Sequence, residues 1–410
     1  MIVTACRICD NRELLSVLDL GEQALTGVFP ASRDEVVPSV PLELVACSPA
    51  GCGLVQLRHT PDPGLMYGEG YGYRSGIRPF MINHLRGKVA TVRELVDLGP
   101  GDLVVDIGSN DATLLRGYPA DGPQLVGIDP TGGKFRELYP PNAELIADYF
   151  SRETFVNRFG ARRAKAVTSI AMFYDLPDPM GFMRDVRDIL TEDGVWLLEQ
   201  SYLPAMLEAD AYDVVCHEHL EYYALRQIEW MAERVGLTVI RAELTDVYGG
   251  SLCAVLARTG SRHRRDEAGL ARIRALETKL RLDTMAPFEG FARRVHDQRD
   301  TLREFLADSR EAGRLTLGYG ASTKGNVILQ YCGITETDLP CIGEVSAEKA
   351  GRFTPGTGIP IVSEEDAKAQ KPDQLLVLPW IYRDGFVERE QRFLEGGGKL
   401  VFPLPRLAAV

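Results

Sequence analysis

The sequence predicts an α/β protein in which a doubly wound parallel sheet is flanked by a small N-terminal metal-binding module and a C-terminal α/β domain. Three observations support this prediction. Four cysteines stand in two close pairs near the N-terminus. A strand, a glycine turn, a helix and a second strand ending in an acid follow one another between Asp102 and Asp129. A similar strand and glycine turn lead into a helix between Arg314 and Gly325.

The composition is that of an ordinary globular protein of 410 residues, with 45% hydrophobic and 25% charged residues. The formal net charge is −12 and the one short basic run spans 261–265, so we expect no nucleic-acid partner. The N-terminus has no secretory signal pattern, and no window of about 18 apolar residues predicts a membrane span. We therefore expect a cytoplasmic protein with reduced thiols and no membrane partner. The sequence leaves the oligomeric state open, a monomer included.

The cysteine pairs have the spacing of a zinc site. Two residues separate Cys6 from Cys9, and four separate Cys47 from Cys52. Two such pairs can hold one tetrahedral zinc ion, because a tight turn places both sulfurs of a pair on one side. Four thiolates leave no open position for a substrate, so we predict a structural zinc site. The alternative is two unrelated pairs of small buried cysteines.

The middle of the chain predicts a nucleotide-binding βαβ unit. The run Leu103–Ile107 is apolar and β-branched, as in a buried parallel strand. Gly108 then permits a tight turn and the close approach of a ligand. The next strand ends at Asp129, where an acid typically binds ribose hydroxyls.

The turn itself indicates which nucleotide. It lacks the G-x-G-x-x-G spacing, and the carboxylates of Asp106 and Asp111 would repel a pyrophosphate. They suit S-adenosylmethionine, which has no phosphate and carries a sulfonium and an ammonium group. The pattern also resembles the first motif of class I methyltransferases; the alternative is a generic turn without ligand. We assign to the cofactor site Asp106, Gly108, Asn110, Asp111, Asp129, Asp148, Tyr149, Phe150 and Ala171.

The third part of the chain predicts an amphipathic helix over 267–313 and then a second α/β domain. Backbone amides at the helix that follows the second glycine turn, together with Lys324, can bind an anion such as a diphosphate. Simple strand–helix packing is the alternative. We assign to the substrate site Gly320, Ala321, Ser322 and Lys324, and Glu199 at the end of an earlier strand, where a structural role is equally open. The expected domains are 1–75, 76–260 and 261–410.

The segment "CHEHLEYY" admits three interpretations: a metal site, packed core histidines, or an acid/base site. A metal site is disfavoured, because the adjacent side chains of His217, Glu218 and His219 diverge on a helix or a strand. Residue type alone does not separate the other two. Tyr222, which follows closely, is a candidate for catalysis or for packing.

Taken in order, the cysteine module, "GSND", "CHEHLEYY", "YGGS" and "GYGASTKGN" resemble the deoxysugar C-methyltransferase family from Cys6 to about Trp380. The resemblance implies a class I methyltransferase sheet, a Rossmann-like C-terminal domain, and a sugar-nucleotide cleft between the two. It implies that His219 is the catalytic base, with Glu218 beside it. A tyrosine after the zinc module would face the sugar; Tyr73 is the preferred match and Tyr71 the alternative.

The implied reaction is S-adenosylmethionine-dependent C-methylation of a nucleoside-diphosphate-linked keto-deoxysugar, at C3 beside a 4-keto group. A sugar carbon becomes acidic beside a carbonyl, and the ordinary histidine pKa of about 6.5 suits the base. Tyr73, Tyr222 and a protonated His217 are the candidates to stabilise the enolate oxygen. The alternatives are an O- or N-methyltransferase on a sugar nucleotide, and an epimerising or binding protein without methyl transfer.

Overall fold

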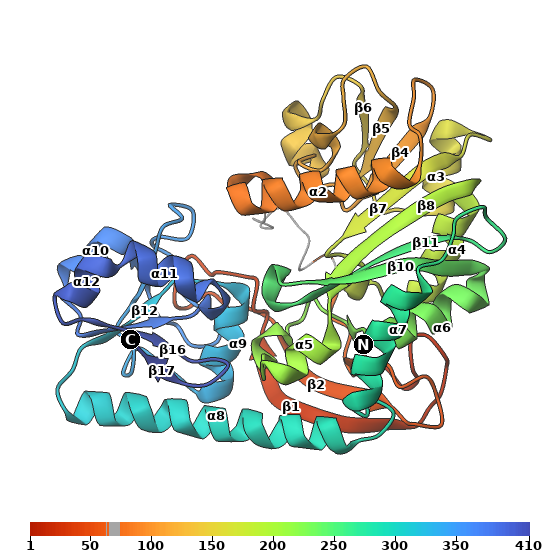
Figure 1. Cartoon of the computed structure of the whole chain (residues 1–410). Helices are drawn as coiled ribbons and strands as arrows, with labels where there is room; N and C mark the ends of the chain where they lie inside the picture. The colour runs from red at the N-terminus through yellow and green to blue at the C-terminus, as the bar shows by residue number, and fades with distance from the viewer. Residues whose placement is uncertain (63, 65–73) are drawn as a thin grey trace.

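The chain folds around three β-sheets with covering helices, which confirms the predicted α/β class (Figure 1). This computed structural model describes residues 1–62, 64 and 74–410. In that part of the chain, no helix combines the length and apolar character needed to cross a bilayer. One continuous cluster of buried side chains runs through the N-terminal sheet, one face of the middle sheet and the C-terminal sheet.

The N-terminal sheet is antiparallel and takes its fourth strand from a distant segment. Its strand order is β1-β2-β3-β9. The strands are β1 (Leu14–Ala24), β2 (Ser39–Cys47), β3 (Val55–Leu57) and β9 (Glu221–Tyr222). Because β9 begins two residues after His219, the "HEH" segment is attached to the N-terminal module rather than lying free beside the middle sheet.

The middle sheet has seven strands in the order β10-β11-β8-β7-β4-β5-β6. The five strands from β8 to β6 are parallel, and β11 is antiparallel to both of its neighbours. Strand order reverses between β4 and β7, which is where doubly wound sheets bind ligands. The strands are β4 (Leu103–Ile107), β5 (Gln124–Ile128), β6 (Ala143–Ile146), β7 (Ala164–Ile170), β8 (Leu190–Ser201), β10 (Leu237–Thr245) and β11 (Ser251–Arg258).

Helices cover both faces of this sheet. Apolar side chains of α2 pack on one face, and those of α3, α4 and α6 pack on the other. The helices are α2 (Pro79–Leu95), α3 (Arg152–Phe159), α4 (Pro179–Ile189), α5 (Leu203–Glu208) and α6 (Leu225–Val235). Short 3-10 turns are η1 (Ser75–Ile77), η2 (Leu115–Gly117), η3 (Gly132–Leu138), η4 (Phe173–Asp175), η5 (Tyr212–Val214) and η6 (Val247–Gly249).

The predicted single helix over 267–313 is wrong, because the structure has two helices there. They are α7 (Glu267–Lys279) and α8 (Ala286–Glu311). Arg281 between them has a φ of 56°, a left-handed conformation that ends a helix. The 26 residues of α8 span roughly 39 Å, and this helix runs below both β1 and the C-terminal sheet (Figure 1).

The C-terminal sheet has six strands in the order β14-β13-β12-β15-β16-β17, and all but β17 are parallel. Its strands are β12 (Thr316–Tyr319), β13 (Ile342–Glu344), β14 (Ile361–Ser363), β15 (Gln374–Val377), β16 (Lys399–Phe402) and β17 (Ala408–Ala409). Its helices are α9 (Thr323–Cys332), α10 (Glu364–Ala369), α11 (Arg383–Arg389), α12 (Gln391–Glu395) and the 3-10 turn η7 (Trp380–Tyr382).

Candidate active site

The four cysteines predicted to hold zinc lie together. The sulfur atoms of Cys6, Cys9, Cys47 and Cys52 are all within 4.8 Å of one another. The closest sulfurs come from opposite pairs, 3.4 Å apart for Cys6 and Cys52 and 3.5 Å for Cys9 and Cys47. A tetrahedral ion with zinc–sulfur bonds of about 2.3 Å needs sulfur–sulfur separations of roughly 3.8 Å. The donor set therefore fits one zinc ion, which would hold the two cysteine turns together.

A cavity of about 630 Å³ opens at the carboxyl ends of β4, β5 and β7, at the point where the strand order reverses. Its volume lies in the range of small-molecule sites. A more open hollow of about 870 Å³ lies beside β6, at the opposite ends of the strands, where doubly wound sheets do not bind their ligands. The residues of the predicted cofactor site that line the first cavity are Asp106, Gly108, Asn110, Asp129, Tyr149, Phe150 and Ala171.

The carboxylate of Asp129 is held rigidly at the cavity wall. Its Oδ1 accepts hydrogen bonds from the backbone N and the hydroxyl of Thr131, each at 2.7 Å. Its Oδ2 accepts from the backbone N of Asn110 at 2.8 Å. A carboxylate can accept about four hydrogen bonds, so capacity remains for a hydroxyl donor. This is the arrangement that a ribose-binding acid requires.

The backbone is strained at two residues that line the same cavity. Asn110 and Ala171 have left-handed φ values of 48° and 53°. This conformation costs a residue other than glycine roughly 1–2 kcal/mol, and such strain is often concentrated at functional sites. Gly108 has a φ of 73°, and a Cβ there would come within 3.1 Å of the Met172 side chain. The turn therefore needs glycine at this position.

Asp111 and Asp148, also assigned to the cofactor site, are not among the residues that line the cavity. Asp111 is fully buried, and its Oδ2 accepts a hydrogen bond from the backbone N of Gly76 at 3.0 Å. It therefore fastens the segment before α2 to the glycine turn. The Oδ1 of Asp148 accepts from the backbone N of Tyr149 at 2.7 Å.

Glu199, assigned to the substrate, is instead bound by α2. Its carboxylate lies 2.5 Å from His84 Nε2 and 2.6 Å from Lys88 Nζ, and all three side chains are at most 12% exposed. Burial alone would raise the pKa of Glu199, but the hydrogen bond from His84 and the charge of Lys88 outweigh burial and lower it. Since Met81 and Leu85 on α2 line the cavity, these contacts favour a role for Glu199 in positioning the cavity wall.

We expect Glu199→Gln to weaken S-adenosylhomocysteine binding by about 10–100-fold, the range for one lost hydrogen bond between charged groups. Calorimetric titration measures this effect. The lowered pKa of Glu199 means that its contribution to stability is present above the unfolded value of about 4.3 and is lost as the pH falls below it. The matched control is Glu243→Gln, because Glu243 is 38% exposed and lies farther from Lys88, at 3.3 Å. Equal affinities for the two variants would contradict the positioning role.

His219 lies in a turn between η5 and β9, with its ring fixed in one orientation. Its Nδ1 is 3.0 Å from the carbonyl oxygen of Val214. Because a carbonyl only accepts hydrogen bonds, Nδ1 carries the proton and Nε2 is left unprotonated, as a base requires. The ring packs against Tyr174, with centroids 4.3 Å apart. Burial, together with the charge of Lys324, lowers the pKa of His219 to about 3. The imidazole is therefore neutral at pH 7, but it is a weaker base than the ordinary value of about 6.5 predicts.

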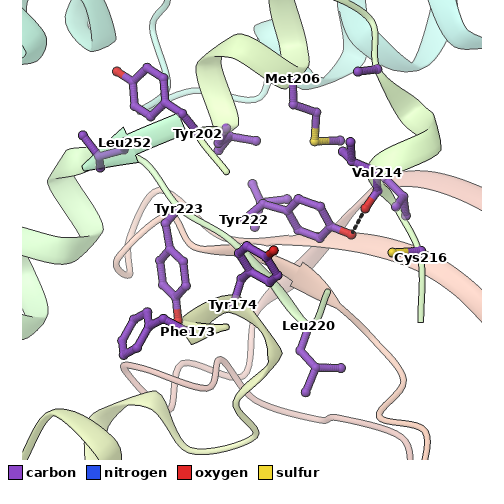
Figure 2. Close-up of a cluster of buried hydrophobic side chains, with 14 of the residues drawn as sticks. Phe173, Tyr174, Tyr202, Met206, Val214, Cys216, Leu220, Tyr222, Tyr223 and Leu252 are labelled. Carbon is purple, nitrogen blue, oxygen red and sulfur yellow. Dashed lines mark hydrogen bonds between the residues drawn. The ribbon is translucent and has the colours of Figure 1, made fainter. Parts of the chain in front are cut away.

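The other two predicted catalytic residues of this segment have contacts of their own. His217 is 1% exposed, and its Nε2 lies 3.0 Å from the carbonyl oxygen of Val40. Burial lowers the pKa of His217, so the predicted protonated form that stabilises an enolate conflicts with the structure. The Tyr222 hydroxyl donates to Val214 O at 3.2 Å (Figure 2), so it supports the carbonyl that orients His219 and is not available to an enolate.

Glu218 stands where the three parts of the chain meet. A Cβ at Gly27 would lie 2.5 Å from Glu218 Oε1 and 3.8 Å from the hydroxyl of Thr323, so this part of the N-terminal module lies beside both the carboxyl group and the start of α9. Its Oε2 is inaccessible to solvent and has no hydrogen-bond partner among the described residues. Burial raises the pKa of Glu218, which favours its protonated form.

The second glycine turn leads into α9 as the sequence suggests. Ser322 caps the helix by accepting a hydrogen bond from the backbone N of Gly325 at 3.0 Å. The backbone N of Ala321 donates to Glu344 Oε2 at 2.8 Å, and Lys349 Nζ donates to Ala321 O at 2.7 Å. Glu344 ends β13, so the C-terminal domain has the order of strand, glycine turn, helix and strand-end acid. In the middle domain the described residues between β4 and β5 form only the 3-10 turn η2, so the helix predicted after Gly108 is wrong.

Sequence reasoning missed several residues that surround the turn containing His219. Tyr174 packs on the imidazole, and Trp380 Nε1 donates to Asp213 Oδ2 at 2.8 Å, which ties the C-terminal domain to η5. Glu344 carried a usable signal, since it is an acid at the end of the second strand of a βαβ unit. Tyr71 and Tyr73, predicted to face the sugar, lie outside the described residues.

Three family models match the chain in succession. They are described as "Putative zinc binding domain" over residues 6–67, "Methyltransferase domain" over 81–242 and "C-methyltransferase C-terminal domain" over 246–405. The C-methyltransferase NovU of Streptomyces niveus is 30% identical over 408 residues, which cover 98% of this chain and 96% of NovU.

Solved structures of methyltransferases also match, at lower sequence identity and over a smaller part of this chain. The CcbJ methyltransferase of Streptomyces caelestis has 13% identity and a TM-score of 0.35, covering 46% of this chain and 94% of its own. An S-adenosylmethionine-dependent methyltransferase of Clostridium acetobutylicum has 12% identity and a TM-score of 0.33, with coverages of 46% and 94%.

The family assignment rests on the match to NovU, which extends over nearly the whole of both chains, and on the order of the three family models. The chain belongs to the S-adenosylmethionine-dependent C-methyltransferase family.

Proposed function

We propose that the protein methylates a carbon of a nucleoside-diphosphate-linked keto-deoxysugar, at C3 beside a 4-keto group, with His219 as the base. The observation that carries this proposal is the hydrogen bond between His219 Nδ1 and Val214 O, which leaves Nε2 free to take a proton. Gly27 lies beside both Glu218 of this turn and Thr323 at the start of α9, which supports a substrate site shared with the C-terminal domain.

The start of α9 is the proposed site for the diphosphate. Its first backbone N–H groups have no partner within the helix, and Ser322 occupies only part of this capacity. Lys324 adds a positive charge that lowers the pKa of both His219 and Asp213, which supports a diphosphate site near the turn containing His219. A substrate with its diphosphate at α9 would therefore carry its sugar toward Glu218 and His219.

Cofactor binding is assigned to the cavity at the ends of β4, β5 and β7, with Asp129 on the ribose hydroxyls. Bound S-adenosylmethionine supplies an electrophilic methyl group. The nucleophile is the sugar carbon beside the carbonyl. His219 Nε2 takes the proton from that carbon and holds it as imidazolium, and the C–H electron pair remains on the substrate as the enolate. Lys324 is the group proposed to stabilise the negative charge that develops on the carbonyl oxygen, with Glu218, whose pKa is raised by burial, beside it.

The test is proton exchange in heavy water. The protein is incubated with S-adenosylhomocysteine and a thymidine-diphosphate 4-keto-6-deoxyhexose, and the C3 hydrogen of the sugar is followed by NMR. We expect this signal to disappear only with enzyme, and a new carbon-bound methyl group to appear when S-adenosylmethionine replaces the homocysteine. Methylation without exchange would indicate an oxygen or nitrogen acceptor, and exchange without methylation would indicate an epimerising protein.

A further inference from the structure

We propose that Arg7, which stands between two cysteines of the zinc module, is a positioning residue that holds His219 in its working orientation. The inference rests on the proposed function, because it takes His219 as the base. It assigns a catalytic purpose to the N-terminal module, which would otherwise have only a structural one.

The Arg7 side chain is directed at the two residues that immediately follow His219. It is only 4% exposed. Its Nη1 donates to Leu220 O at 3.4 Å, and its Nε lies 3.4 Å from Glu221 Oε1. The rest of the guanidinium is anchored in the module, with Nη1 to Leu57 O and Nη2 to the Thr60 hydroxyl, both at 2.8 Å.

The interaction with Glu221 is a buried ion pair. The Glu221 side chain is fully buried, and Arg7 supplies a cation within 4 Å of its carboxylate. Burial raises the pKa of Glu221 well above its ordinary value, and the charge of Arg7 offsets that rise only in part. Buried ion pairs contribute little net stability, because both charges lose hydration, but they restrict the chain to one arrangement. Such a pair therefore agrees better with a positioning role for Arg7 than with a role in stabilising the fold.

Other contacts hold the same segment from the same side. Leu57 N donates to Leu220 O at 2.8 Å within the pairing of β3 with β9, and His217 Nε2 bonds to Val40 O. From the middle domain, Leu220 N donates to Tyr174 O at 2.8 Å. His219 is therefore bracketed by module contacts at residues 217 and 220–222. Among these contacts, the side chain of Arg7 links the turn between Cys6 and Cys9 directly to the strand that follows His219.

The proposed role is separable from zinc binding and from cofactor binding. A guanidinium has no lone pair to offer a metal. None of the residues that contact Arg7 lines the cofactor cavity. A misplacement of about 1 Å at a catalytic group can cost on the order of 100-fold in rate, so the expected effect of losing Arg7 is large and specific to the proton-removing step.

The test uses the full chain with Arg7→Met combined with Glu221→Gln, so that no unpaired charge is left buried. Arg7→Lys is a second variant that keeps the charge but loses the forked donor geometry. The matched control is Arg12→Met, an exposed arginine of the same module. Four quantities are measured: zinc content, S-adenosylhomocysteine affinity, the rate of C3 proton exchange, and the imidazole nitrogen NMR signals of His219. The chain has six histidines, and the His219 signals are identified by their loss in His219→Asn.

We expect the Arg7 variants to keep zinc and to bind S-adenosylhomocysteine within about threefold of wild type, while exchange slows by about 10–100-fold. The His219 signals should change from a single Nδ1–H tautomer to a mixture, and Arg12→Met should change nothing. Unchanged exchange and unchanged His219 signals would overturn the proposal. A parallel loss of zinc, cofactor affinity and exchange would also overturn it, since Arg7 would then support the fold in general. If His219→Asn itself leaves exchange intact, the proposed base is wrong, whereas a changed tautomer in the Arg7 variants would still show that Arg7 positions the ring.

Discussion

His219→Asn is expected to slow exchange of the sugar C3 hydrogen by about 10²–10⁴-fold, the range that general base catalysis contributes. Asparagine retains a donor that can bond to Val214 O, in place of the imidazole Nδ1, but it has no basic nitrogen. The turn should therefore keep its shape while the base is lost. The measurement is the initial rate of exchange in heavy water with S-adenosylhomocysteine bound.

The control for this variant is His296→Asn, because His296 is an exposed histidine on α8, far along the chain from the turn. It should leave exchange unchanged. Affinity for S-adenosylhomocysteine should be the same in wild type and in both variants, since His219 does not line the cavity. If His219→Asn exchanges the hydrogen as fast as wild type, another residue is the base.

The lowered pKa of His219 makes a further prediction about pH. In the folded protein this pKa is about 3, below the ordinary value of about 6.5 in the unfolded chain. As the pH falls below about 6.5, the unfolded chain takes up a proton at this residue before the folded protein does. The contribution of His219 to stability is therefore present above pH 6.5 and is lost as the pH falls toward 3. In urea unfolding from pH 7.5 to 5, wild type should lose more stability than His219→Asn does; parallel pH profiles would contradict the lowered pKa.

Loss of zinc is expected to have the second large effect, unfolding of the N-terminal module. Apparent binding free energies for four-ligand zinc sites in small peptides are about 10–16 kcal/mol at pH 7, and much of that is folding free energy. Cys47→Ser removes a candidate ligand at the end of β2, where the second cysteine turn begins. Because β9 pairs with this module, we expect proton exchange to be lost together with the module's fold.

The cofactor cavity should survive the same change, because it is built on the seven-stranded sheet. The experiment compares zinc content, thermal unfolding and S-adenosylhomocysteine binding in wild type, Cys47→Ser and Cys341→Ser. The last is the control, a buried cysteine of the C-terminal sheet outside the four-cysteine cluster. We expect Cys47→Ser to lose zinc and exchange but to retain cofactor binding. A variant that retains full exchange without zinc would show that the metal does not maintain the site.

Features encoded by residues close in sequence could be predicted before the structure. The four cysteines lie in two local turns, and the turn containing Gly108 follows β4 directly, with Asp129 at the end of β5. Spacing and residue type within each cysteine pair, and within the 21 positions from Gly108 to Asp129, were sufficient to predict these features. The turn before α9 is a further example, and its acid at Glu344 was predictable by the same reasoning. The helix predicted between β4 and β5 is wrong, because that fully described stretch forms only the 3-10 turn η2.

Features that depend on backbone groups or on distant pairing could not be predicted in this way. The tautomer of His219 is set by the carbonyl of Val214, and every residue type carries the same carbonyl. Glu199 pairs with side chains of α2, which lies more than 100 residues earlier in the chain. These contacts favour a role in positioning the cavity wall over the predicted contact with the substrate.

The sequence by itself determined the order of the three parts, the cysteines that cluster and the strand and glycine turn at the cavity, because each depends on short-range patterns of residue type. Only the tertiary structure decided what holds the "HEH" segment. Arg7 and Glu221 are separated by 214 positions, and Val55 of β3 pairs with Tyr222 of β9 across 167 positions. Such long-range contacts are stabilised by burial and by complementary shape, which no local pattern records. The proposed catalytic residue, His219, was therefore identifiable from its motif. Its orientation depends on the N-terminal module, which lies far in sequence from both His219 and α9.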